Sequence, residues 1–153
     1  MRTGTSRAVA SAASIVLLAL GCSSTAASEG ASSGAVTKTI GPEGGTIVVE
    51  GATVTFPANA LVTATAITIT PSDDPPPAGY VALSRVIRCA PSGTTFATPV
   101  TMAMTFDGDP TGATMFWSSG EDPSFKDVGG SASGSVMSAG VLHFSSGFVG
   151  LKR

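Results

Sequence analysis

An alternation of apolar and polar residues, with a period of two, recurs along this chain. In PVTMAMTF (residues 99–106), Val100, Met102, Met104 and Phe106 fall on one side of an extended backbone. In TAITITP (65–71), isoleucines alternate with threonines in the same way. Successive side chains of a strand point to opposite faces, so the pattern predicts strands with one buried face.

Glycine, proline, aspartate and serine interrupt these runs at short intervals, which divides the chain into short strands. GGTIVVEGATVTFP (44–57) predicts two strands joined by a tight turn at Glu50 and Gly51. Further strands are expected over 80–89, 113–118, 124–128, 134–138 and 141–149. The proline-rich segment 73–79 is expected to be a loop, and FPANALV (56–62) to form one helical turn. The sequence therefore predicts an all-β fold, an antiparallel β-sandwich.

The first residues have the composition of an export signal. Arg2 and Arg7 precede an uncharged stretch, Ala8 to Leu20, that is too short for a membrane-spanning helix. The stretch ends in LLALGC (17–22), which resembles the lipobox of bacterial lipoproteins, although Ala19 and Leu20 stand in a less common order. The resemblance implies a signal peptide over 1–21 and a lipidated Cys22 carrying diacylglycerol and an amide-linked acyl group such as palmitate. The alternative is an ordinary secretory signal cut within TAAS (25–28).

The residues after Cys22 predict where the protein resides. Buried acyl chains contribute about 0.8 kcal/mol per CH₂, so two or three chains anchor a protein to a membrane stably. Ser23, rather than aspartate, follows the cysteine, and by the lipoprotein sorting rules this favours the outer membrane of a Gram-negative cell envelope. Residues 22–35 are rich in serine, alanine and glycine and are expected to form a flexible tether to a domain over 36–153.

Charge and cysteine content limit the classes of function. Removing Arg2 and Arg7 from the eight basic residues leaves six against ten acidic residues, without a basic run, so no nucleic-acid partner is expected. If Cys22 is lipidated, Cys89 is left without a disulfide partner in its own chain. Its setting in VIRCAP (86–91) indicates a half-buried small hydrophobe at a strand end. Pairing with Cys22 or between chains remains the alternative.

Four segments occur in an order that resembles the ZU5 domain family. GPEGGTIVVEGATVTFPANAL (41–61) is similar to the opening of that domain, and it is followed by ITITP, FATPVTMAM (96–104) and LHFSSGF (142–148). The resemblance covers nearly the whole domain. It implies a β-sandwich that acts mainly as an interaction or spacer module, and it supports the fold more than any particular partner. From the predicted location we expect the partner to be an envelope protein or polysaccharide, and we expect no external substrate.

The resemblance also draws attention to His143, Phe144 and Ser145, because some ZU5-containing proteins cleave themselves between phenylalanine and serine. It implies that Ser145 would be the nucleophile, His143 the base and Phe144 the acyl donor. Such chemistry needs a base and backbone strain at the cleaved bond. We expect instead a closing strand in which Leu142, Phe144 and Phe148 face the core, while His143 and Ser145 point outward. Self-cleavage is kept as the alternative.

Two further groups are considered for binding. Trp117, if exposed, could stack on a sugar as in a carbohydrate-binding module, but its spacing from Met115 favours burial in the core. Asp107 and Asp109 partly match a calcium loop; Thr111 and Ser118, however, occupy positions where stronger ligands are needed, so a solvated turn is expected. Asp73 and Asp74 are likewise expected to be turn residues. No cofactor, metal or enzymatic activity is predicted.

Overall fold

The computed structural model describes residues 34–119 and 124–153, and this part of the chain is all β-strand, turn and loop. The strands are β1 Val36–Ile40, β2 Gly45–Val49, β3 Ala52–Phe56, β4 Thr65–Ser72, β5 Tyr80–Ala82, β6 Val86–Ala90, β7 Thr95–Thr105, β8 Thr114–Ser118, β9 Phe125–Gly129, β10 Ser131–Ser133, β11 Val136–His143 and β12 Ser146–Lys152. No helix of the described residues is long and apolar enough to cross a membrane. The predicted lipidation site Cys22, the signal peptide and residues 22–33 lie outside the described residues.

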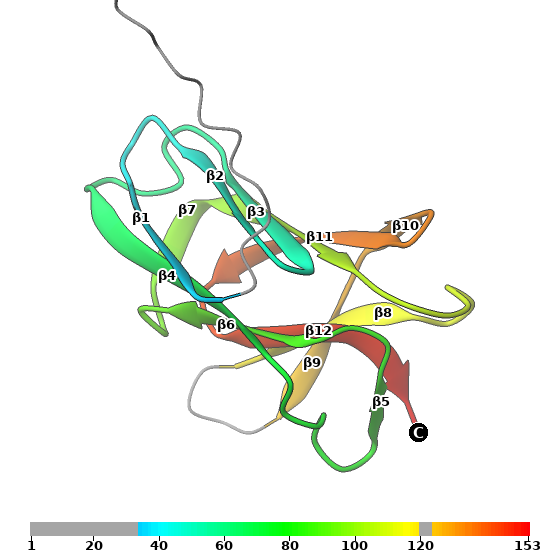
Figure 1. Cartoon of the computed structure of the whole chain (residues 1–153). Coiled ribbons are helices and arrows are strands. Elements are labelled where there is room, and N and C mark those ends of the chain that lie inside the picture. The colour runs from blue at the N-terminus through cyan, green and yellow to red at the C-terminus, as the bar shows by residue number, and fades with distance from the viewer. Residues whose placement is uncertain (1–33, 120–123) are drawn as a thin grey trace, which may run out of the picture.

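The strands form two antiparallel sheets packed as a sandwich (Figure 1). The smaller sheet has the order β10-β11-β7-β3-β2. The larger sheet has the order β1-β4-β6-β12-β8-β9, with β5 paired to the far end of β12. The last strand, β12, is therefore central, because it pairs with β6, β8 and β5. The predicted all-β antiparallel sandwich is confirmed.

The alternating runs form the core between the sheets. Val100, Met102, Met104 and Phe106 are at most 3% exposed, as their spacing predicts. Ile67 and Ile69 of β4 face them from the other sheet and are fully buried. A fully buried side chain of this size contributes about 1.5–3 kcal/mol to stability, so these two strands supply a large part of the driving force.

A second, smaller cluster lies on the outer face of the larger sheet. Phe116 alternates with Met115 and Trp117, which belong to the main core, so its side chain points away from that core. It packs with Phe148 and Val86, and Tyr80 and Phe125 cover this group. Strand β8 is therefore buried on both faces.

The β2–β3 hairpin agrees with the sequence, and the segment that follows it does not. Val49 pairs with Ala52 across the predicted turn, in which Gly51 has a φ of 78°. The helical turn predicted over 56–62 is wrong. Asn59 has a φ of 64°, the left-handed conformation that asparagine tolerates, and the Ala60 N–H bonds the Pro57 carbonyl at 3.1 Å in a β-turn.

Other observed strand boundaries also differ from the predicted ones. The predicted strand 80–89 is divided into β5 and β6, and 73–79 is the expected loop. The predicted strands 134–138 and 141–149 are wrongly separated: Gly140 pairs with Thr101 inside a continuous β11. The break comes later, at residues 144–145, where the chain leaves the smaller sheet and enters the larger one.

Candidate functional site

The His143-Phe144-Ser145 segment lies where the chain crosses between the two sheets. His143 is the last residue of β11 in the smaller sheet, and Ser146 is the first residue of β12 in the larger one. The register of β11 on β7 also shifts between Val141 and His143, which is a β-bulge or a similar irregularity. The bond between Phe144 and Ser145 is thus at a bend, and the single closing strand expected over this segment is wrong.

Phe144 anchors this bend in the core. Its side chain is fully buried and packs edge-to-face on Phe56 and Phe96, with ring centroids 5.7 and 4.8 Å away. Its N–H donates to the Thr94 carbonyl at 2.8 Å, and its own carbonyl accepts from the Gly93 N–H at 2.8 Å. The backbone on both sides of this residue is therefore held by the loop that precedes β7.

Five side-chain orientations were expected for this segment, and His143, expected to point outward, is half-buried. Phe144 and Phe148 are buried as expected, although Phe148 belongs to the outer cluster. Leu142, expected in the core, is 57% exposed, and Ser145, expected on the surface, is only 4% exposed. Both expectations are wrong because the shifted register and the change of sheet interrupt the two-residue alternation.

Ser118, which the sequence did not single out for this site, contacts both of the candidate reactive residues. Its hydroxyl is hydrogen-bonded to the Ser145 hydroxyl and accepts the Ser146 N–H at 3.3 Å. Its carbonyl lies 3.1 Å from Nε2 of His143. A carbonyl oxygen only accepts, so Nε2 is the protonated nitrogen in this contact. No hydrogen bond joins His143 directly to Ser145 in the described structure.

The pairing of β8 with β12 explains why Ser118 reaches this position. Gly147 lies opposite Trp117, so Ser118 lies beside the start of β12. Both Ser118 and Ser145 are buried, at 6% and 4% exposed. The order of residues around Ser118, MFWSSGEDPSF, gives no signal of this long-range contact, because only the register of two strands far apart in sequence creates it.

Trp117 is buried in the core as predicted, with 2% of its surface exposed. Its Nε1–H donates to the His143 carbonyl at 3.0 Å, and its ring lies directly over Gly147. A cavity of about 340 Å³ opens beside it, lined by Gly93, Thr95, Trp117, Ser118, Ser119, Lys126, Val128 and His143. The indole ring is packed against Gly147 next to this cavity, and its face is not free to stack on a sugar ring.

Cys89, in strand β6, contacts the same bend at residues 144–145. It is buried, with 4% exposed, and its N–H donates to the Ser145 carbonyl at 2.8 Å. Burial raises the pKa of the thiol to about 12, because an apolar environment disfavours the thiolate. The expected small hydrophobe is confirmed, and it is more deeply buried than the sequence indicated.

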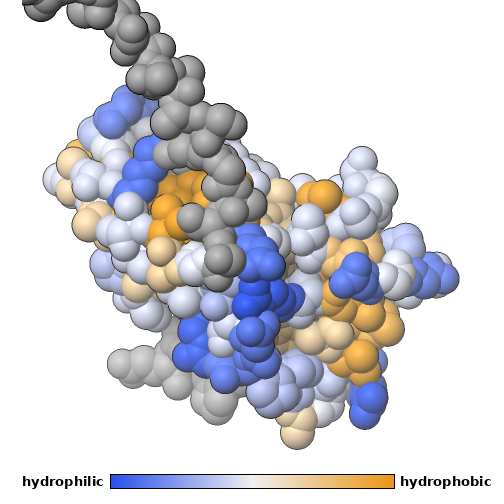
Figure 2. Space-filling model, in the orientation of Figure 1, coloured by the Kyte–Doolittle hydropathy of each residue, from blue (hydrophilic) through white to orange (hydrophobic). Residues whose placement is uncertain are grey.

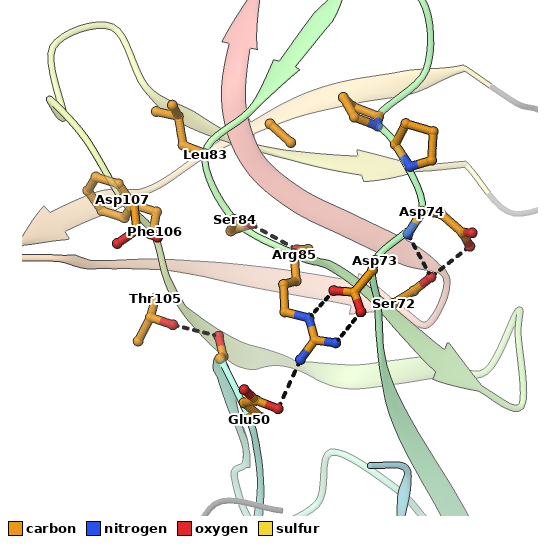
Figure 3. Close-up of a pocket in the computed structure, with 14 residues that line it drawn as sticks. Glu50, Ser72, Asp73, Asp74, Leu83, Ser84, Arg85, Thr105, Phe106 and Asp107 are labelled. Atoms are coloured by element: carbon orange, nitrogen blue, oxygen red, sulfur yellow. Dashed lines mark hydrogen bonds and ion pairs between the residues drawn. The ribbon is translucent and has the colours of Figure 1, made fainter. Parts of the chain in front are cut away.

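A second cavity, of about 620 Å³, lies at the end of the sandwich where the β2–β3 turn meets the β4–β5 loop (Figure 3). Arg85 extends into it and pairs with Asp73 through two nitrogens, at 2.8 and 2.9 Å, and with Glu50 at 3.0 Å. Hydrogen bonding to Asp73 raises the pKa of the guanidinium further. These contacts tie a loop of the larger sheet to a turn of the smaller one.

Asp74 has its own partners beside this cavity. Its carboxylate accepts from the Ser72 hydroxyl at 2.6 Å and pairs with Arg88. The pKa of Asp74 is lowered, first by the Ser72 hydroxyl and then by the charge of Arg88. The two aspartates predicted as turn residues are thus also ion-paired, and Figure 2 shows hydrophilic residues gathered over this part of the surface.

The other acidic candidates form a local turn. Asp109 accepts both the N–H and the hydroxyl of Thr111, at 2.8 and 2.6 Å, and these bonds lower its pKa. Asp107 is exposed in the same loop. Within residues 34–119 and 124–153, no three histidine, cysteine or acidic side chains are placed to hold a metal ion. Glu121 and Asp122, the next acidic residues along the chain, lie outside the described residues.

The comparison with known families identifies the fold. The model of the ZU5 domain matches residues 36–115, from the start of β1 to the second residue of β8. No curated protein matches the sequence. The family match and the antiparallel sandwich agree with one another and with the motifs found between residues 41 and 104, whereas the motif at 142–148 lies beyond the matched range. The chain belongs to the ZU5 domain family.

Proposed function

We propose that this chain is a lipoprotein of the bacterial cell envelope, in which the ZU5 β-sandwich is a structural or protein-interaction module without an external substrate. The observation that carries the proposal is the arrangement of the sequence: a lipobox ending at Cys22, a serine-, alanine- and glycine-rich segment, and then β1 at Val36. A β-sandwich of this family fits such a module.

The described side chains support a module without catalytic chemistry. Arg85 is neutralised by Asp73 and Glu50 in the larger cavity. In the smaller cavity, the Nε2 of His143 is engaged by a carbonyl. In the larger cavity the Ser72 hydroxyl is bonded to the Asp74 carboxylate, but this carboxylate is also paired with Arg88, and its lowered pKa makes it a weak base. Neither cavity, as described, therefore presents a nucleophile bonded to an effective base, which is the arrangement that covalent catalysis on an external substrate requires.

Anchoring is tested by labelling the full chain with radioactive palmitate in a bacterial host and separating membrane from soluble fractions. We expect label in the wild-type chain and in Cys89→Ala, and neither label nor membrane association in Cys22→Ala. Cys89→Ala is the matched control because it removes the other cysteine of the chain. Label that persists in Cys22→Ala, or a wild-type chain without label, contradicts the proposal.

A carbohydrate-binding role is the alternative that Trp117 suggests from sequence. Because the indole is 2% exposed, we expect a blue-shifted emission that envelope polysaccharides do not change. Trp117 is the only tryptophan, so the emission reports this site alone. A saturable spectral shift on addition of polysaccharide would favour the carbohydrate-binding role over the protein-interaction module.

A self-processing domain is the second candidate, and one observation favours it: the carbonyl of Phe144 accepts a hydrogen bond from the Gly93 N–H, which would stabilise negative charge developing on that oxygen. In this reaction the Ser145 hydroxyl attacks the Phe144 carbonyl carbon and passes its proton to His143. The C–N bond then breaks, the amine takes the proton from His143, and water hydrolyses the ester to a Phe144 carboxylate and a free Ser145 hydroxyl.

The test of self-processing is an intact-mass measurement after denaturation. Denaturation is necessary because residues 145–153 include β12, which pairs with three strands and would keep a cleaved tail in place. A fragment that ends at Phe144 supports the second candidate. A chain that remains intact after prolonged incubation supports the module without self-processing.

A further inference from the structure

We infer that Ser118 is an internal restraint that keeps the Phe144–Ser145 bond intact. Its hydroxyl binds the nucleophile, Ser145, and its backbone carbonyl binds the base, His143. The inference goes beyond the anchored module. For its chemistry it rests on the self-processing reaction described above.

The nucleophile is the first group that Ser118 restrains. The Ser145 hydroxyl is hydrogen-bonded to the Ser118 hydroxyl, which also accepts the Ser146 N–H at 3.3 Å. Attack on the Phe144 carbonyl carbon requires the Ser145 oxygen to leave this contact and turn toward its own preceding peptide. Both serines are buried, so no bulk water replaces the lost partner.

The base is the second group. Nε2 of His143 lies 3.1 Å from the Ser118 carbonyl and therefore carries a proton in this contact. In this tautomer Nδ1 is the basic nitrogen, and it makes no hydrogen bond with Ser145 in the described structure, while the contact of Nε2 with Ser118 holds the ring in its present orientation. The Trp117 Nε1–H holds the His143 carbonyl at 3.0 Å, so the backbone of His143 is fixed while its ring is restrained.

The electrophile of the reaction, the Phe144 carbonyl, is by contrast already hydrogen-bonded and held in place. The Phe144 carbonyl accepts the Gly93 N–H, and the ring of Phe144 is fully buried against Phe56 and Phe96. One element of the reaction that the described structure withholds is the contact between Ser145 and His143. That contact is replaced by two contacts to Ser118.

Removal of the Ser118 hydroxyl should release the nucleophile. In Ser118→Ala the Ser145 hydroxyl becomes a buried donor without a partner, a state that is unfavourable and that makes another acceptor nearby more attractive. The imidazole of His143, two residues earlier in the chain, is the candidate acceptor for this hydroxyl. We expect cleavage at Phe144–Ser145 to become about tenfold faster than in the wild type, as for the loss of one restraining hydrogen bond.

The experiment uses the full chain and its variants, incubated at neutral pH, denatured and weighed by intact-mass spectrometry. We expect the wild type to be intact, Ser118→Ala to release a fragment ending at Phe144, and Ser118→Cys, which keeps the size but bonds more weakly, to cleave at an intermediate rate. Ser118→Ala combined with Ser145→Ala, or with His143→Gln, should remain intact. Ser119→Ala, an exposed neighbouring serine, is the matched control and should behave as wild type.

The possible outcomes distinguish a failure of the Ser118 restraint from a failure of the self-processing reaction. A wild type that cleaves as fast as Ser118→Ala overturns the restraint and leaves the self-processing reaction standing. Ser118→Ala and Ser118→Cys chains that fold, as judged by buried Trp117 emission, yet stay intact overturn the restraint and the reaction together. Neither result affects palmitate labelling of Cys22, which tests the anchored module independently.

Discussion

Gly147 allows β8 and β12 to pack closely, and replacing it with alanine should destabilise the domain strongly. A Cβ at this position would lie 2.1 Å from Cε3 and 2.5 Å from Cζ3 of Trp117, and 2.8 Å from the Phe116 carbonyl oxygen. Carbon atoms in contact are normally about 3.5–4.0 Å apart, so the ring would have to move by roughly 1.4 Å.

The surroundings of Trp117 leave little room for this movement. The ring is 2% exposed, and a shift would break the hydrogen bond from its Nε1 to the His143 carbonyl. Overpacking costs about 1–3 kcal/mol and the lost hydrogen bond about 1 kcal/mol, which gives a destabilisation of about 2–4 kcal/mol. Domains of this kind have free energies of unfolding of about 5–15 kcal/mol, so the loss is a large fraction of the total.

The assay is urea unfolding followed by the fluorescence of Trp117. With a slope of about 1–3 kcal/mol per M, Gly147→Ala should lower the midpoint by about 1–3 M. Gly140→Ala is the matched control, because its Cβ would lie 3.4 Å from that of Pro99, an ordinary contact, and should leave stability unchanged or raise it slightly. A Gly147→Ala midpoint within about 0.3 M of wild type would refute the packing argument.

Three further predictions concern other parts of the sandwich. In Cys22→Ala, the Cys89 thiol should resist iodoacetamide at pH 8 until the domain unfolds, because burial raises its pKa to about 12; fast labelling of folded protein would contradict this. Since the pKa of Asp74 is lowered in the folded state, its contribution to stability is present above the unfolded value and is lost as pH falls below about 4. Asp74→Asn should therefore flatten the acid limb of a stability-against-pH curve, and an unchanged limb would count against the Ser72 and Arg88 contacts. Leu142→Ser should change the free energy of unfolding by less than about 0.5 kcal/mol, whereas Phe144→Ala should cost about 3–5 kcal/mol; equal effects would contradict the bend.

Local sequence rules predicted the parts of this fold that local chemistry determines. The alternation of Val100, Met102, Met104 and Phe106 depends only on the pleat of one strand, and all four are buried. The turn at Gly51 depends on the freedom of glycine to adopt a positive φ. The family resemblance, carried by the order of several such motifs, was confirmed by the match over residues 36–115.

The candidate site was harder to predict because distant pairings create it. LHFSSGF has the alternation of a single strand, and nothing in these letters marks the change of sheet after His143. For that reason Leu142 and Ser145 were placed on the wrong sides. Ser118 and Arg85 were missed for a related reason: their partners lie 27 and 35 residues away in sequence, across strand pairings that no local pattern specifies.

The central claim, an intact sandwich held to a membrane by a lipidated cysteine, is tested most directly by the intact mass of the full-length gene product recovered from bacterial membranes and denatured. The account predicts one species that begins at Cys22, carries the mass of diacylglycerol with or without an amide-linked acyl chain, and retains the residues after Phe144. An unmodified chain that begins within residues 25–28 would contradict the anchor, and a lipidated chain that ends at Phe144 would contradict the intact domain.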